Sequence, residues 1–152
     1  MARRVATALA VGVAVVCATG LAAAPSDSDL QVVRLDPDPA PPGGRTVVHA
    51  FVSNQGPDRT ASPFTVVVDL PQGFTAEGPY FPEDCRADAA GRVVRCTFGA
   101  GLARLRTATA LVPVRVDADV PPGAKAEGHV QVVSDDDCAP GNDRTPFTLS
   151  VS

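Results

Sequence analysis

The sequence has no tryptophan and only one tyrosine among 152 residues. Ligand pockets tend to have aromatic walls, so this shortage argues against a small-ligand carrier, which stays an alternative. No segment repeats its apolar residues with a sustained helical period, which argues against a helical fold. There are only two histidines, His49 and His129, and no Gly-x-Ser-x-Gly motif. Because a Ser/His/Asp triad needs a histidine beside a nucleophile on a strained turn, we predict no catalytic residues and no enzyme.

The sequence also lacks an excess of basic residues. It contains 13 Lys and Arg and 17 Asp and Glu, for a net charge of −4. Residues 1–24 hold two of the basic residues and none of the acidic ones, so the remainder carries 11 − 17 = −6. Nucleic-acid binding needs a basic stripe or patch, so we expect no nucleic-acid partner.

The N-terminus has the three-part layout of a secretory signal. Two arginines precede an uncharged run over residues 5–24, and the polar sequence PSDSD follows. We predict a signal peptide over residues 1–24, cleaved after Ala23 or Ala24, and therefore a secreted, extracellular protein that is either free or associated with the envelope. The alternative is an uncleaved membrane anchor, since about twenty uncharged residues can span a bilayer. Its many alanines and glycines argue against that alternative.

The part after the signal, residues 25–152, is long enough for one domain with its own core. No second hydrophobic segment follows, so we expect no membrane span after cleavage. All 15 prolines and 11 of the 13 glycines fall in this part, where valine dominates the patterned stretches. Such a composition favours short β-strands separated by turns.

Apolar residues alternate with period two along several short segments. In residues 45–54, for example, Val48 and Val52 share one face of the expected strand. Pro113 interrupts another alternating segment, which we therefore expect to carry a bulge or to lie at an edge. Seven or eight short strands with regular turn signals predict an immunoglobulin-like antiparallel β-sandwich. The expected strands cover residues 30–35, 45–54, 63–70, 92–98, 107–120, 129–134 and 145–152.

The end of the strand over residues 63–70 is marked by the sequence DLPQGF. Pro71 lacks a hydrogen-bond donor and Gly73 permits a positive φ, so the ladder must stop there. We expect Phe74 to fold back as an apolar plug at the end of the sheet. The four prolines of residues 36–44 likewise exclude pairing and predict a stiff extended connector.

Three cysteines follow the signal, and disulfides persist in an oxidising extracellular environment. If Ala90 and Gly91 form a two-residue hairpin loop, counting back places Cys85 opposite Cys96, near bonding distance. We predict this disulfide. Cys138 is then left over as a free or intermolecular thiol; its pairing with one of the other two cysteines stays an alternative.

Several of these segments together resemble a conserved repeat of bacterial cell-surface proteins, catalogued as domain of unknown function 11. The matching segments are VSNQGP (52–57), VVVDLPQGF (66–74), the cysteine pair with VVRCTFGAGL, and the late SDDDCAPGND. The resemblance covers roughly residues 29–152. The family occurs in secreted actinobacterial proteins, and the resemblance implies an immunoglobulin-like sandwich, often in tandem arrays on the envelope, with no established enzymatic activity. In contrast to the tandem arrays of that family, we expect a single copy without a wall anchor here.

An acidic loop supplies the candidate metal ligands. Calcium binds six to eight oxygens, and a loop with four carboxylates offers several, but the alternating spacing of a calcium loop is missing. Asp, Asn, Pro and Gly are also ordinary loop formers, so a solvated loop is the favoured interpretation. The sequence LDPDPAP has the same ambiguity. We predict no cofactor; the weak calcium candidates are Asp135, Asp136, Asp137, Asn142 and Asp143.

The sequence therefore predicts a non-enzymatic extracellular β-sandwich module, structural or binding, that acts through sheet edges and turn loops. Its partner is unknown, with an envelope protein or a glycan as the expected classes. The alternatives are a small-ligand carrier and a calcium-stabilised adhesion-type module.

Overall fold

The computed structural model describes residues 26–137 and 139–152. The predicted signal peptide and Cys138 lie outside the described residues. None of the helical segments in the described part has the length and apolar character needed to cross a bilayer. The described residues form nine strands and one short 3₁₀ helix, η1: β1 (Leu30–Val33), β2 (Arg45–Asn54), β3 (Phe64–Asp69), β4 (Phe74–Ala76), β5 (Arg86–Ala87), β6 (Val93–Phe98), β7 (Thr107–Val116), β8 (Lys125–Ser134), η1 (Pro140–Asn142) and β9 (Arg144–Ser150).

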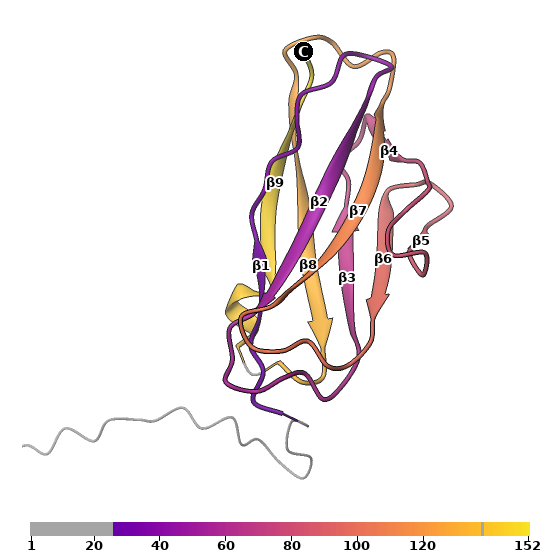
Figure 1. Ribbon diagram of the computed structural model, residues 1–152. Helices are drawn as coiled ribbons and strands as arrows, with labels where there is room; N and C mark the ends of the chain where they lie inside the picture. The colour runs from indigo at the N-terminus through magenta and orange to yellow at the C-terminus, as the bar shows by residue number, and fades with distance from the viewer. Residues whose placement is uncertain (1–25, 138) are drawn as a thin grey trace, which may run out of the picture.

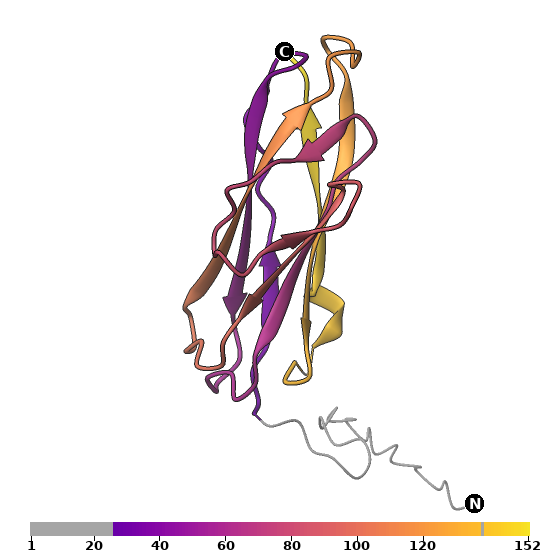
Figure 2. The same ribbon diagram turned by 90° about the vertical axis from the view of Figure 1, so that its right-hand side faces the viewer.

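The strands form two antiparallel sheets that face each other along an elongated molecule (Figures 1 and 2). One sheet has the order β1-β2-β7-β4 and the other has the order β5-β6-β3-β8-β9. The prediction of an all-β, immunoglobulin-like sandwich is confirmed. The sequence predicted seven or eight strands, and the list of expected strands lacked β4 and β5, because they are only three and two residues long and carry no alternation of their own.

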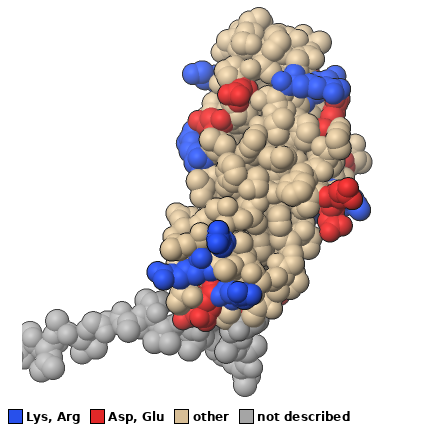
Figure 3. All heavy atoms as spheres, in the orientation of Figure 1, with Lys and Arg blue, Asp and Glu red and all other residues tan. Residues whose placement is uncertain are grey.

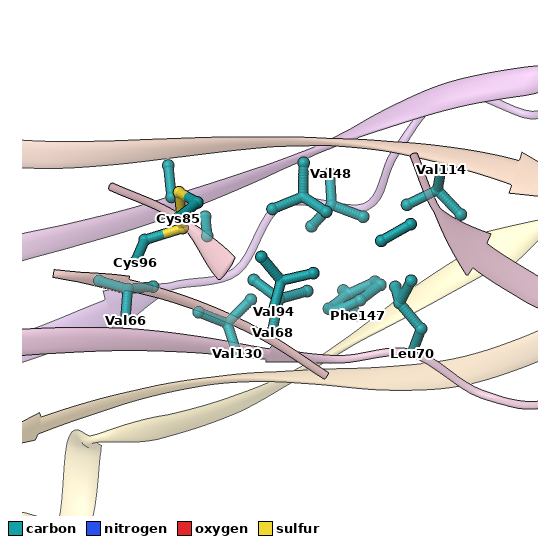
Figure 4. Close-up of a cluster of buried hydrophobic side chains, with 14 of the residues drawn as sticks. Val48, Val66, Val68, Leu70, Cys85, Val94, Cys96, Val114, Val130 and Phe147 are labelled. Carbon is teal, nitrogen blue, oxygen red and sulfur yellow. A yellow bond between two sulfur atoms is a disulfide. The ribbon is translucent and has the colours of Figure 1, made fainter. Parts of the chain in front are cut away.

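The core between the sheets is built mainly from valine, as the period-two pattern requires. Val48 and Val52 of β2 are fully buried, while His49 between them is exposed. Two phenylalanines, Phe74 and Phe147, are the largest fully buried side chains, and Figure 4 shows Phe147 among the valines of both sheets. Burying each such side chain stabilises the fold by about 1.5–3 kcal/mol.

The strand end at DLPQGF forms as predicted, but the role of Phe74 differs. β3 ends at Asp69, and Gly73 has φ = 89°. Phe74 is buried, yet it does not plug the sheet that it has just left. It begins β4 and pairs with Val116 in the opposite sheet, because the turn at Gly73 carries the chain across the sandwich.

The prediction that Pro113 marks a bulge or an edge is wrong. β7 lies inside its sheet, and Pro113 pairs in regular register with Val47 of β2. The proline is tolerated because its nitrogen faces away from β2. On the side away from β2, the segment that follows β4 pairs with this part of β7 at two points only. Glu77 N–H donates to Pro113 O, and Phe81 forms an antiparallel bridge with Leu111.

β8 begins at Lys125, four residues before the expected start. Its first half looks like a turn in the sequence because it contains Gly128, where the alternation requires an inward apolar side chain. The ring of Phe147 occupies that space instead, since a Cβ at Gly128 would lie 2.4 Å from its Cζ atom. The glycine is therefore a packing requirement, not a strand breaker.

The structure contains the expected disulfide between Cys85 and Cys96, and both cysteines are buried (Figure 4). The predicted two-residue hairpin loop is wrong, however. The last backbone pair is Asp88 with Val93, and the Asp88 carboxylate accepts hydrogen bonds from the Arg92 and Val93 N–H groups. Cys85 still lies opposite Cys96, because the observed four-residue loop, residues 89–92, has the same midpoint as the predicted loop of Ala90 and Gly91.

Candidate interaction surface

The outer side of the four-stranded sheet carries a continuous set of apolar side chains. Outward-facing residues of neighbouring strands lie opposite each other: Val33 faces Phe51, His49 faces Leu111, and Val47 faces Pro113. Phe81 adds to this surface because it forms an antiparallel bridge with Leu111. We call this surface the β2–β7 face; its members are Val33, Val47, His49, Phe51, Pro113, Leu111 and Phe81.

The apolar members of the β2–β7 face are in part strongly exposed. Val33 is 43% exposed and Phe81 is 57% exposed, the latter being among the most exposed large hydrophobic residues described. The space-filling view in Figure 3 looks onto this side of the molecule and shows an uncharged centre with charged groups at the margins. His49 lies within the face, with its ring centroid 6.0 Å from that of Phe51.

The charged side chains at the margins of the face form ion pairs with one another. Glu77 accepts from two arginines, with Arg115 Nε at 2.6 Å and Arg45 Nη2 at 2.8 Å. On another margin Arg34 Nη2 lies 3.2 Å from Asp36 Oδ2. Such exposed pairs contribute little to stability, but they leave the neighbourhood of the face with a small net charge.

A groove of about 460 Å³ runs beside the face, between the connector that follows β1 and strand β2. Asp36 fixes one wall, since its carboxylate accepts from Thr148 N–H at 2.8 Å. This hydrogen bond, together with one from Arg34, lowers the pKa of Asp36. The lining is mixed, with no aromatic ring besides an imidazole: Leu35, Asp36, Pro37, Asp38, Pro39, Arg45, Thr46, Val47 and His49.

The structure keeps the two histidines apart. His49 lies on the β2–β7 face, whereas His129 belongs to β8 of the other sheet, where its Nε2 is 3.4 Å from Glu127 Oε1. They share no site.

The carboxylate of Asp136, in the acidic loop, accepts hydrogen bonds from backbone N–H groups of two distant segments. It is fully buried, and its Oδ1 accepts from Ser26 N–H at 2.6 Å. Its Oδ2 accepts from the N–H groups of Ala61 and Ser62 at 2.5 and 3.2 Å. One carboxylate thus joins the N-terminal segment, the β2–β3 loop and the β8–β9 loop. Sequence reasoning missed this role, because all three N–H groups are far away along the chain.

The remaining candidate calcium ligands have other contacts. Asp137 accepts from Leu30 N–H at 3.0 Å, and Asn142 Nδ2 donates to Asp29 Oδ1 at 2.8 Å. Asp135 is exposed. Burial and the neighbouring Asp137 and Asp29 carboxylates raise the pKa of Asp143 to about 7. Among residues 26–137 and 139–152, no three His, Cys, Asp or Glu side chains are arranged to hold a metal ion.

The sequence signal for the β2–β7 face was incomplete. The alternation in residues 45–54 correctly separates inward from outward side chains, so Val47, His49 and Phe51 could be placed on one side. Phe81 had no such signal, since it lies in a proline-rich loop and reaches the sheet through a single bridge. The alternation shows which face of its own strand Val33 or Leu111 occupies, but it does not show that the two residues lie on the same face of one sheet.

No protein-family model matches the sequence, and no curated protein matches it. Among solved structures, the third cohesin of ScaC from Acetivibrio cellulolyticus, in complex with the ScaB dockerin, is similar with a TM-score of 0.51 at 15% identity. The alignment covers 80% of this chain and 98% of the cohesin. BcpA, the major pilin subunit of Bacillus cereus, is similar with a TM-score of 0.50 at 12% identity, over 82% of this chain and 39% of that chain. At these identities the likeness shows the fold: an immunoglobulin-like β-sandwich.

Proposed function

We propose that this protein is an extracellular, non-enzymatic module that binds another protein through the β2–β7 face. The observation that carries the proposal is the uncharged surface in which Val33 and Phe81 remain 43% and 57% exposed. The largest contiguous apolar patch on a soluble domain, typically about 300–600 Å², is often a functional interaction site. The solved complex of a similar fold with a dockerin supports the idea that such a sandwich can serve as a binding module.

Two features support an extracellular location. The buried disulfide between Cys85 and Cys96 persists in an oxidising compartment. The sequence of residues 1–24 has the layout of a secretory signal. Membership of the conserved cell-surface repeat family, expected from the sequence, stays a prediction.

The size of the face limits what it does alone. Three strands and the Phe81 segment, about 4.8 Å apart, with five residues of about 3.4 Å each, give the face roughly 300 Å². A stable protein interface buries about 800 Å² per partner. The β2–β7 face is therefore the centre of an interface that extends onto neighbouring loops, or the whole of a weak one.

The proposal is tested by capture from the organism's own envelope extract. The variant Val33→Lys/Phe81→Lys places two charges on the β2–β7 face, and we expect it to lose capture that the unmodified domain shows. Val133→Lys is the matched control, because Val133 is 51% exposed on the other sheet. Protease treatment of the extract should abolish capture as well. Equal capture by the face variant, or capture that survives protease and fails after deglycosylation, would refute a protein partner at this face.

A further inference from the structure

The loop between β6 and β7 presents an unusual apex, and we propose that this apex anchors an acidic protein segment that also carries apolar side chains. The inference rests on the proposed function and names the chemistry of its partner. The apex consists of Arg104, Leu105 and Arg106, with Arg59 of the β2–β3 loop at the same end of the sandwich; we call this group the basic apex. It borders the β2–β7 face, because β7 begins at Thr107.

The loop is held in place by Asn54, the last residue of β2. Asn54 is fully buried, and its Nδ2 donates to Leu102 O at 2.9 Å and to Asp58 O at 2.7 Å. Its backbone fixes the apex directly: Leu105 N–H donates to Asn54 O at 2.8 Å, and Asn54 N–H donates to Arg106 O at 3.1 Å. Every one of these bonds ties the β6–β7 loop or the adjoining β2–β3 loop to the rigid sheet.

A second buried residue, Thr60, fixes the start of the same loop. Its Oγ1 accepts from the N–H groups of Gly101 and Leu102, each at 3.0 Å. Thr60 N–H donates to Leu102 O at 3.1 Å, and Thr60 itself is 1% exposed. A loop ordered in this way before binding loses little entropy when a partner arrives.

Leu105 stands out at the apex of this ordered loop. It is 64% exposed, the most exposed large hydrophobic residue described, and it has φ = 58°. It is the one non-glycine residue with positive φ in the described part of the chain. Left-handed backbone at a branched apolar residue is strained, and such strain concentrates at functional sites. At Leu105 the left-handed backbone holds an apolar side chain in solvent.

The charges around Leu105 indicate what the partner carries. Arg59, Arg104 and Arg106 are exposed, and no ion pair involves them among the described residues. Figure 3 shows basic side chains gathered at this end of the visible side. Arginine forms bidentate, charge-assisted hydrogen bonds with carboxylates. An unpaired arginine group around an exposed leucine therefore fits carboxylates around apolar side chains.

A protein segment fits this end better than an anionic membrane does. A flat lipid surface would also meet the β8–β9 loop, which lies at the same end of the sandwich (Figure 1) and carries the exposed Asp135, and this carboxylate repels lipid phosphates. A segment seated on the apex contacts the arginines and Leu105 without covering the β8–β9 loop.

The experiment uses phage-displayed random dodecapeptides selected on the 25–152 domain, and the affinity of an enriched peptide for this domain is then compared with its affinity for Arg104→Glu/Arg106→Glu. We expect enriched peptides to carry two or more Asp or Glu beside apolar residues. A synthetic peptide from that pool should bind at least tenfold more weakly to the double variant, by fluorescence anisotropy. Leu105→Gly should weaken binding about fivefold while leaving the melting temperature unchanged or higher, because glycine adopts positive φ freely. Arg144→Glu, an exposed arginine on β9, is the control and should change affinity less than twofold.

Three results would overturn the inference: no enrichment of peptides, enriched peptides without acidic residues, or equal affinity for the apex variants. Binding of phosphatidylglycerol vesicles that depends on the same residues, without peptide selection, would overturn it in favour of a lipid. A failure of the proposed function would be seen in a different experiment, because that test measures envelope capture by the variant Val33→Lys/Phe81→Lys.

Discussion

Replacing Asp136 by asparagine tests how the N-terminal segment is attached to the sandwich. The side chain is fully buried and accepts three backbone N–H groups, from Ser26, Ala61 and Ser62. Asparagine has nearly the same shape but only one acceptor oxygen, and its NH₂ group would face at least one of these donors. The substitution therefore isolates the loss of acceptor capacity from the loss of volume.

The expected cost follows from the number of hydrogen bonds lost. If the amide oxygen keeps Ala61 and Ser62, Ser26 loses its acceptor and meets a donor instead. A hydrogen bond to a charged group contributes about 1.5–3 kcal/mol, and a buried donor left without a partner costs about 1–3 kcal/mol. We therefore expect Asp136→Asn to lower the free energy of unfolding by roughly 2–4 kcal/mol. For a domain of this size each kcal/mol shifts the melting temperature by about 3–5 °C.

Urea denaturation and thermal melting of the 25–152 domain measure this cost. Asp135→Asn is the matched control, since Asp135 is exposed in the same loop, and it should change stability by less than about 0.5 kcal/mol. The reasoning is refuted if the two variants unfold at the same urea concentration and temperature. Asp136→Ala should be at least as destabilising as Asp136→Asn, because it removes all three acceptor contacts.

Three further predictions concern stability. Replacing Cys85 and Cys96 by serine, or reducing the disulfide, should lower the free energy of unfolding by about 2–3 kcal/mol; an unchanged urea midpoint under reductant would contradict this. Gly128→Ala should cost about 1–3 kcal/mol because its Cβ would overlap Phe147, whereas Gly141→Ala, with no atom nearby, should be neutral in the same melts. The pKa of Asp143 is raised to about 7, so its protonated form contributes stability that is present below pH 4 and lost as pH rises through 7. Asp143→Asn should remove that part of the pH dependence, and a variant whose melting temperature falls between pH 4 and 7 as steeply as the wild type would disprove the assignment.

Local patterns predicted the features that depend on neighbouring residues. The alternation of valines located the long strands and divided the side chains of β2 correctly between its two faces, because side-chain direction has period two in any strand. The disulfide followed from the same logic, since register along a hairpin fixes which residues face each other. Even the wrong loop length left Cys85 opposite Cys96.

Features that depend on distant residues were not predictable from local patterns. Asp136 looked like one of several loop aspartates, and only the fold brings Ser26, Ala61 and Ser62 to it. Gly128 resembled a turn residue because the sequence does not show that Phe147 fills its space.

The interaction surface shows the same division. The outward residues of β2 could be identified from their spacing, but the strand order that places Val33 and Leu111 on the same face is a tertiary property. Phe81 joins them through a single bridge from a loop. The positive φ of Leu105 was not predicted either, because leucine rarely adopts it; in the structure Leu105 N–H donates to Asn54 O, and Arg106 N–H donates to Ala103 O across the turn.

Hydroxyl-radical footprinting of the domain bound to its captured envelope protein tests the central claim most directly. If the β2–β7 face binds that protein, oxidation of Phe81 should fall several-fold on binding, while Val133 on the opposite sheet should be oxidised as in the free domain. Protection of Val133 with unchanged oxidation of Phe81 would contradict the account, because it would place the partner on the other sheet.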